Sequence, residues 1–343
     1  QVITYHEGYS FGFRGFSLRS SWTGQIRARK VGHMASQAQT LATLYALTGK
    51  REYAEAARAV LLRFAESYPN YLVHSSYGEW IDLPPHLVAE RINDLPEDEW
   101  TIPPNKPDRK LHSGYWNSGR ATGSGMEGGF IRHLATAYDL IHEVLTDDER
   151  LKIEKDLLIE GTILLLADPA LNNKSVSNLT GAGMVGMAVG DPGLVRTGAE
   201  GFWHFIRRWF LFDGTTSESP AYGMMTLNGL WNFGEALHGY SDPDGYREQD
   251  RMQDVDVYAD GDCRAVYQAF YDTMLPNLRY PTAADSYVPT SLGTQYAELM
   301  VARYGFSEYR ALLGELVDGP PEETSEEYAL FHRAPDFSIL AED

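Results

Sequence analysis

The sequence predicts an all-α fold, an incomplete (α/α) toroid built from antiparallel helical hairpins. Three observations support this prediction. Apolar residues recur at steps of three and four over most of the 343 residues, as they do on one face of a helix. No alternation of strand and helix patterns indicates a parallel sheet. One segment, 176–189, is crowded with glycine and alanine, which suits an inner helix that neighbouring backbones approach closely. An open solenoid of helix pairs is the alternative, although no fixed repeat period is present.

The first 24 residues are rich in glycine, serine and aromatic residues without a helical period, so an extended arm is expected over 1–24. The toroid domain is expected over 25–318. Its first helix spans 25–47 and is followed by Gly49, a residue suited to the left-handed position that ends helices. A second helix is expected over 53–68.

A long irregular region rich in Pro, Tyr, Trp, Asp and His is expected over 69–127. Connections of this length are usually functional or pack as a lid. Helices resume at Gly129, and the run from Thr146 to Glu149 is a capping box that starts a helix reaching about residue 166. A linker and a short acidic tail are expected over 319–343. Further helices are expected at 176–189, 193–211, 221–238, 263–275 and 293–315.

The composition narrows the classes of partner. The formal net charge is −19, which argues against nucleic acid, because phosphate binding needs clustered Lys and Arg. A local basic cleft can still bind an anion on an acidic protein. The 21 Tyr, 14 Phe and 7 Trp are compatible with stacking on sugar rings and equally with packing in a large core.

The single cysteine, Cys263, excludes an intrachain disulfide and is expected to be a small buried side chain. No apolar run reaches the roughly 20 residues that span a membrane, so no membrane partner is expected. The chain begins at Gln1 without a signal-like segment. It therefore reads as a mature or trimmed chain of a secreted or periplasmic protein.

Two polar loops each lead into a predicted helix. The first contains Asn172 and Asn173, and the second, over 213–223, delivers Tyr222 to the first turn of its helix. An asparagine amide donates two hydrogen bonds, and a helix start adds positive potential, so such a loop can neutralise a carboxylate. A tyrosine beside it can move a proton, although its phenol has a reference pKa of about 10. The pair suggests elimination chemistry on acidic sugars, whereas capping for Asn173 and core packing for Tyr222 are the ordinary explanations.

Several short segments form a recognisable series by their order and spacing over about 25–315. They are Ala42–Ala54, Phe64–Tyr71, Ala137–Ile141, Asn172–Asn173, Gly190–Pro192, Asp213–Gly214, Ser219–Tyr222 and Ala284–Ser286. This series resembles the helical domain of the heparinase II/III-like polysaccharide lyases, a group related to alginate and oligoalginate lyases.

The resemblance implies a lyase that breaks the bond at C4 of a uronic acid and leaves an unsaturated sugar, with no cofactor. It assigns Asn173 to neutralising the carboxylate, with Asn172 and Asn178 as the other matches, and Tyr222 to proton transfer. Members of the family usually continue into a C-terminal β-sandwich that supplies a further catalytic residue. This sequence stops before such a domain, so the sandwich is expected to be missing here.

The remaining candidates lie in polar loops. His112 is ranked first among the ten histidines as an auxiliary acid or base. Arg120 carries a planar fork that suits a carboxylate or sulfate, and it equally suits a surface acid. Trp116, Tyr77 and Glu218 are expected to contact sugar, as is Asn172.

No metal-binding signature rises above chance. The acidic run Asp254, Asp256, Asp260 and Asp262 lacks the full spacing of a calcium loop and reads as a solvated loop.

The leading function is a lyase on an acidic polysaccharide. A glycoside hydrolase on the same toroid, which needs two carboxylates, and a non-catalytic carbohydrate-binding toroid remain the alternatives.

Overall fold

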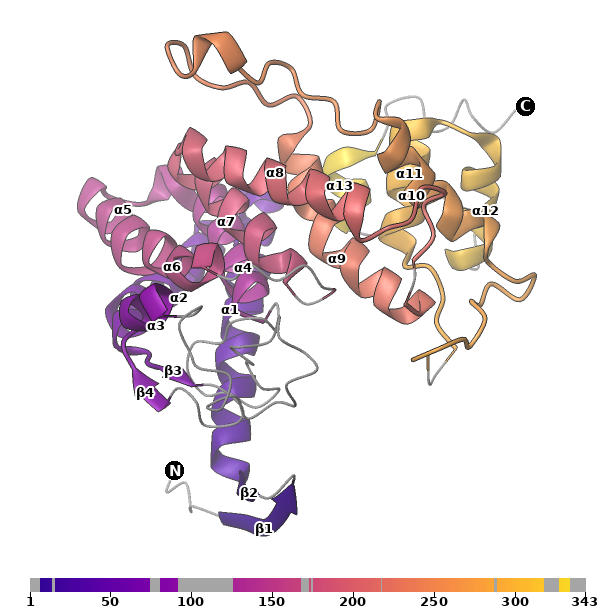
Figure 1. The fold of residues 1–343 in the computed structure, drawn as a ribbon. Helices are drawn as coiled ribbons and strands as arrows, with labels where there is room; N and C mark the ends of the chain where they lie inside the picture. Colours follow the sequence, from indigo (N-terminus) through magenta and orange to yellow (C-terminus); the bar gives the residue numbers. More distant parts are fainter. Residues whose placement is uncertain are drawn as a thin grey trace. The chain divides into compact units, whose positions relative to one another are not determined.

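The computed structural model describes residues 7–13, 16–74, 81–91, 126–167, 173, 175–216, 218–286, 289–317 and 327–333. The described chain is predominantly helical, as predicted, and its helices pack against one another (Figure 1). It divides into two compact units. Unit 1 comprises Gln1–Phe202, Gly229–Ala236 and Pro243–Tyr246, and unit 2 comprises Trp203–Asn228, Leu237–Asp242 and Arg247–Asp343.

Helices α8 and α9 each contribute residues to both units. The elements before α8 are β1 (Glu7–Phe13), β2 (Phe16–Ser21), α1 (Trp22–Thr48), α2 (Arg51–Ser67), η1 (Tyr68–Asn70), β3 (Val73–His74), β4 (Ile81–Leu83), α3 (Pro85–Arg91), α4 (Met126–Ile141), η3 (His142–Val144), α5 (Asp147–Ile153), η4 (Glu154–Ile159), α6 (Glu160–Ala167) and α7 (Val176–Val189). They are followed by α8 (Pro192–Arg208), α9 (Pro220–Leu237), η5 (Glu248–Asp250), α10 (Gly261–Asp272), α11 (Thr294–Tyr304), α12 (Ser307–Val317) and α13 (Glu327–His332).

The described strands form two separate two-stranded antiparallel sheets. β1 pairs with β2, and β3 pairs with β4. The first pair and the start of α1 occupy the segment for which an extended arm is expected. β3, β4 and α3 lie within the segment for which a long irregular region is expected, so parts of it have regular structure.

The core of unit 1 forms where α1 and α2 pack against α4. Gly49 joins α1 to α2 with a φ of 67°, and its amide donates to the carbonyl of Tyr45, as the sequence predicts for a glycine that ends a helix. Small residues such as Ala38 and Ala57 let these helices approach, and Leu61, Leu134 and Tyr138 fill the space between them.

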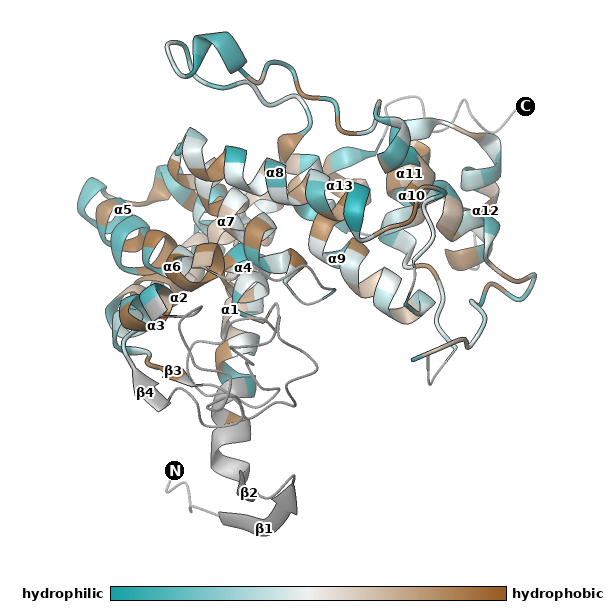
Figure 2. Cartoon of the chain, in the orientation of Figure 1, coloured by the Kyte–Doolittle hydropathy of each residue, from teal (hydrophilic) through white to brown (hydrophobic). Residues whose placement is uncertain are grey.

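The predicted capping box at Thr146 is present and starts α5. The Glu149 amide donates to the Thr146 hydroxyl, and the Thr146 amide donates to the Glu149 carboxylate. A π-helical turn, η4, then connects α5 to α6. Figure 2 shows the change in character, with a hydrophilic start of α5 and a mostly hydrophobic α6.

Helix α7 has the bounds that the sequence predicts, and its glycines bring neighbouring helices into backbone contact. A β-carbon on Gly181 would lie 2.7 Å from the carbonyl oxygen of Gly128 in α4. One on Gly183 would lie 3.0 Å from the Cα of Gly198 in α8 and 2.4 Å from the ring of Phe233 in α9. Real β-carbons almost never come this close, so only glycine fits at these contacts. The close approach expected for this helix is therefore confirmed.

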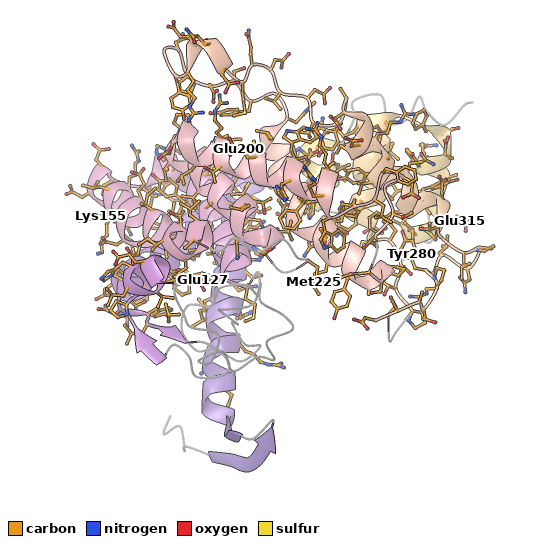
Figure 3. All side chains as sticks on the ribbon, in the orientation of Figure 1. Glu127, Lys155, Glu200, Met225, Tyr280 and Glu315 are labelled. Atoms are coloured by element: carbon orange, nitrogen blue, oxygen red, sulfur yellow. The ribbon has the colours of Figure 1, made fainter. Side chains whose placement is uncertain are left out.

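The core of unit 2 is aromatic. Phe270 and Tyr280 meet edge to face at 5.9 Å, and the Tyr280 hydroxyl donates to the Phe270 carbonyl at 2.8 Å (Tyr280 is labelled in Figure 3). Burial raises the pKa of Tyr280, so its hydroxyl stays protonated. Cys263 is buried, as expected, and burial raises the pKa of its thiol to about 12.

The prediction of one continuous helix over 293–315 is wrong. α11 ends at Tyr304 because Gly305 adopts a φ of 67° and donates its amide to the carbonyl of Val301. α12 then begins at Ser307. The apolar pattern continues through this break, so periodicity alone does not reveal it.

Candidate functional site

Asn173 lies in the turn before α7, as predicted, and its side chain is buried. Three further polar side chains near this helix start, Ser175, Asn178 and Thr180, are also buried. The backbone amide of Asn178 donates to the backbone carbonyl of Ser175 at 2.9 Å, and this bond closes the first turn of the helix. The Thr180 hydroxyl lies 2.9 Å from the carbonyl oxygen of Val176 and 2.7 Å from that of Gly229 in α9. We call these four residues the α7 polar cluster.

The start of α4 is pressed directly against this cluster. A β-carbon on Gly128 would lie 2.0 Å from the carbonyl oxygen of Ser177 and 2.8 Å from the amide nitrogen of Asn178. The preceding residue, Glu127, is buried and accepts a hydrogen bond from the Tyr68 hydroxyl (Glu127 is labelled in Figure 3). Gly128 thus places a carboxylate-bearing helix start beside the first turn of α7.

Tyr222 lies in the first turn of α9, as predicted, and is half-buried. The loop before it is held by local hydrogen bonds. Asp213 accepts from both the amide and the hydroxyl of Thr215, at 3.0 and 2.7 Å, and this hydroxyl and amide hold the pKa of the Asp213 carboxyl below its usual range. Gly214 has a φ of 80° and would bring a β-carbon within 2.0 Å of the Ala265 carbonyl oxygen in α10. These contacts fix the direction in which α9 begins.

The first amides of α9 all donate within unit 2. The Ala221 amide donates to the Ser286 hydroxyl at 3.3 Å, and the Tyr222 amide donates to the Ser219 hydroxyl at 3.3 Å. The Gly223 amide donates to the Ser219 carbonyl at 2.9 Å. The amides expected to add positive potential at this helix start are therefore used in capping. The predicted role in proton transfer therefore concerns the phenol of Tyr222 and not its backbone amide.

Gly229 of α9 belongs to unit 1 and packs on α7, where a β-carbon on Gly229 would lie 2.5 Å from the side chain of Val176.

Of the other predicted site residues, only Glu218 lies among the described residues. Glu218 is exposed, and its amide donates to the Thr216 hydroxyl at 3.1 Å. Five predicted site residues lie outside the described residues: Tyr77, His112, Trp116, Arg120 and Asn172. The segment that carries His112, Trp116 and Arg120 joins α4 at Met126.

Sequence reasoning missed several polar residues at these two helix starts. Glu127 was not singled out, although a glutamate directly before a Gly-Gly pair in a helix is a usable signal of close backbone packing. Ser219 and Ser286 belong to segments that carry the resemblance, but no role was predicted for either. The Ser219 hydroxyl caps an amide only three residues further on, which is a local pattern. The Ser286 hydroxyl caps an amide 65 residues away in the chain, and local sequence patterns do not encode such a contact.

The acidic run after α9 is used in local structure. Asp260 caps α10 by accepting from the Asp262 and Cys263 amides, and both Asp260 and Asp262 pair with Arg207. Within the described ranges, no group of three or more His, Cys, Asp or Glu side chains is arranged to hold a metal ion. None of the described helices is both long enough and apolar enough to cross a membrane.

The described chain is predominantly helical, with Asn173 just before α7 and Tyr222 in the first turn of α9. No protein-family model matches the chain. The chain is similar to a protein of Stenotrophomonas maltophilia (strain K279a) that is named alginate lyase. The two are 26% identical over 207 residues, which cover 57% of this chain and 23% of that protein. The chain thus spans about a quarter of its relative's length.

Proposed function

We propose that this protein is a polysaccharide lyase that cleaves a uronate-containing polysaccharide by β-elimination. The similarity to the protein named alginate lyase carries this proposal. The helical packing around α7 is compatible with the (α/α) toroid expected of heparinase II/III-like lyases, and we extend the proposal to that family and fold. An exported enzyme, secreted or periplasmic, fits a polymeric substrate of this kind.

The proposed reaction assigns a separate task to each helix start. The amide of Asn173 donates to the substrate carboxylate, which stabilises the charge that develops when the C5 proton leaves. The C5–H electron pair forms the C4–C5 double bond, and the C4–O bond breaks. The leaving oxygen then takes a proton, so atoms and charge balance. In this scheme Tyr222 donates that proton and His112 accepts the C5 proton. The two roles are exchanged if a nearby cation lowers the pKa of Tyr222.

Most of the remaining proposed groups belong to residues outside the described ranges. His112 is proposed as the auxiliary acid or base, and Arg120 as a clamp on the substrate carboxylate. Trp116 and Tyr77 are proposed to contact sugar faces, and Asn172 and Glu218 to contact sugar hydroxyls. The buried state of Asn173 supports its place in a site from which water is excluded, where hydrogen bonds to charge are stronger.

An ultraviolet absorbance assay tests this proposal directly. The protein is incubated with alginate, a glycosaminoglycan, an ulvan and a neutral glucan as control. Growth of the unsaturated-uronate band with an acidic polymer and not with the glucan is the expected result. New reducing ends without that band would identify a hydrolase instead. Binding without either product would identify a carbohydrate-binding protein and would overturn the lyase proposal.

A further inference from the structure

A pocket of about 410 Å³ opens in unit 2, away from the start of α9. It lies where the end of α9, the start of α10 and the end of α11 come together. Its lining includes His238, Tyr258, Arg264, Arg303, Tyr304 and Phe306. The volume falls within the range of about 300–1,000 Å³ that is typical of small-molecule sites.

Arg264 is the cation that this pocket presents most openly. Its guanidinium lies over the ring of Phe306 at 4.7 Å and near the ring of Tyr304 at 5.9 Å. Such stacking holds the planar group in place without neutralising its charge. Within the part of the chain that the structure describes, Arg264 forms no ion pair with a carboxylate. By contrast, Arg207, which lies nearby in the same unit, pairs with both Asp260 and Asp262.

A second guanidinium lines the same pocket on an aromatic ring. Arg303 lies over the ring of Tyr258 at 5.3 Å. The pocket therefore combines two fork-shaped donors with several aromatic rings. Guanidinium forks pair with carboxylates through two parallel hydrogen bonds, so a carboxylate is the ligand group that this lining favours.

The one acidic side chain of the lining is engaged by its own loop. The Oδ1 atom of Asp256 accepts from the amides of Tyr258 and Ala259, at 3.0 and 3.2 Å, and lies 3.3 Å from Nδ1 of His238. The lining thus contains two arginines and one aspartate, a local excess of basic side chains on a chain with a net charge of −19.

We propose that this pocket is a second binding site, for a small sugar that bears a carboxylate. The recognition of an anion rests on the pocket alone, whereas the choice of a sugar acid rests on the proposed function. The site is distinct from the turn that holds Tyr222. Tyr222 and His238 are 16 residues apart across the length of α9 and its end, which corresponds to about 24 Å of helix rise.

Calorimetric titration with sodium glucuronate tests the proposal. The titrations use the Asn173→Asp variant to weaken binding at the proposed catalytic site, and a further substitution at Arg264 identifies the part of the binding that belongs to the pocket. Saturable binding is expected in this variant. Adding Arg264→Gln should weaken the affinity at least tenfold. Adding Arg279→Gln should leave it unchanged, because Arg279 is an exposed arginine of the same unit that does not line the pocket.

Three outcomes would overturn the proposal. They are an affinity unaffected by Arg264→Gln, equal binding of glucose, which lacks the carboxylate, and equal binding of acetate, which lacks the sugar ring. Arg264→Lys provides a second variant if the glutamine variant unfolds in circular dichroism. Lysine keeps the charge but not the fork, so affinity should fall between those of arginine and glutamine. Glucuronate binding without lyase activity would support the pocket and count against the proposed function, so the two failures are distinguishable.

Discussion

Gly128 of α4 and Gly181 of α7 face each other at the contact between the two helices. A β-carbon on Gly181 would lie 2.7 Å from the carbonyl oxygen of Gly128 and 3.1 Å from its Cα. The obstructing atoms belong to the backbone, so they cannot rotate away as a flexible side chain would. This contact also sets the position of Glu127 relative to the α7 polar cluster.

Replacing Gly128 by alanine should therefore destabilise the protein. The added methyl would collide with the Ser177 carbonyl, and relief requires the helices to separate, so a loss of about 3 kcal/mol is expected. Chemical denaturation measures it. Gly129→Ala is the matched control, because no atom lies within 4 Å of its added β-carbon. That variant should gain up to about 1 kcal/mol from the better helix propensity of alanine. Equal stability of the two variants would contradict the packing described.

Tyr222→Phe should abolish most turnover while leaving polysaccharide binding within about twofold of wild type. The substitution removes one hydroxyl, and the ring keeps its place in the first turn of α9. Initial rates in the absorbance assay and binding by calorimetry measure the two effects. Tyr271→Phe is the control, since Tyr271 packs edge to face against Tyr309 at 5.4 Å in the same unit. If both variants kept full activity, Tyr222 would have no role in proton transfer.

Asn173→Asp should reduce kcat by about a hundredfold or more, because it replaces a donor with an acceptor that repels the substrate carboxylate. The two side chains have nearly the same shape, so packing around the buried position changes little. Asn228→Asp applies the same change to an exposed residue of α9 and should leave kcat near that of wild type. A thermal melt of both variants separates loss of chemistry from loss of folding.

Arg333→Met should destabilise unit 2 more than Glu298→Gln does. Arg333 reaches Glu298 of α11 through two hydrogen bonds, at 2.6 and 2.8 Å. The Glu298 side chain is fully buried, whereas that of Arg333 is 20% exposed. Removing the arginine leaves a buried carboxylate without its main partner and should cost about 3 kcal/mol or more.

Arg63→Met supplies the comparison for this ion pair. Arg63 pairs with Glu66 on α2 with both side chains largely exposed, so its loss should cost no more than about 0.5 kcal/mol. The midpoints of denaturant unfolding rank the three variants. A larger effect for Arg63→Met than for Arg333→Met would contradict the difference in burial.

The stability of the protein should fall as the pH drops from about 6.5 to about 4 because of His133. Burial and the neighbouring Arg132 lower the pKa of His133 from 6.5 to about 4. Between these values the unfolded chain binds a proton that the folded protein excludes, so acid favours unfolding. The contribution is at most about 1.4 kcal/mol per pH unit. Unfolding free energies across this range should show a shallower slope for His133→Gln.

Much of the helical architecture was predictable because its signals are local. The bounds of α7, the capping box at Thr146 and the left-handed glycine at position 49 each follow from a few neighbouring residues. α3 and α13 were not predicted, since six or seven residues are too few to display a helical period. The break at Gly305 was hidden because apolar residues continue in phase across it.

The candidate site was predictable only in part for a similar reason. The places of Asn173 and Tyr222 before and within helix starts follow from polar loops in the sequence. The burial of Glu127 depends on the tertiary contact between Gly128 and Ser177, and the capping of α9 by Ser286 depends on a loop far along the chain. Neither contact leaves a periodic or motif-like trace in the sequence.

The division of the chain into units has a consequence for synthesis on the ribosome. Unit 1 includes the later segments Gly229–Ala236 and Pro243–Tyr246. It therefore cannot be completed until the chain has emerged beyond residue 246. Until residue 233 has emerged, α7 lacks the packing of Gly229 and Phe233, and its glycine-lined surface stays open. The nascent chain must therefore carry an unfinished first unit while the segments of the second are already being made.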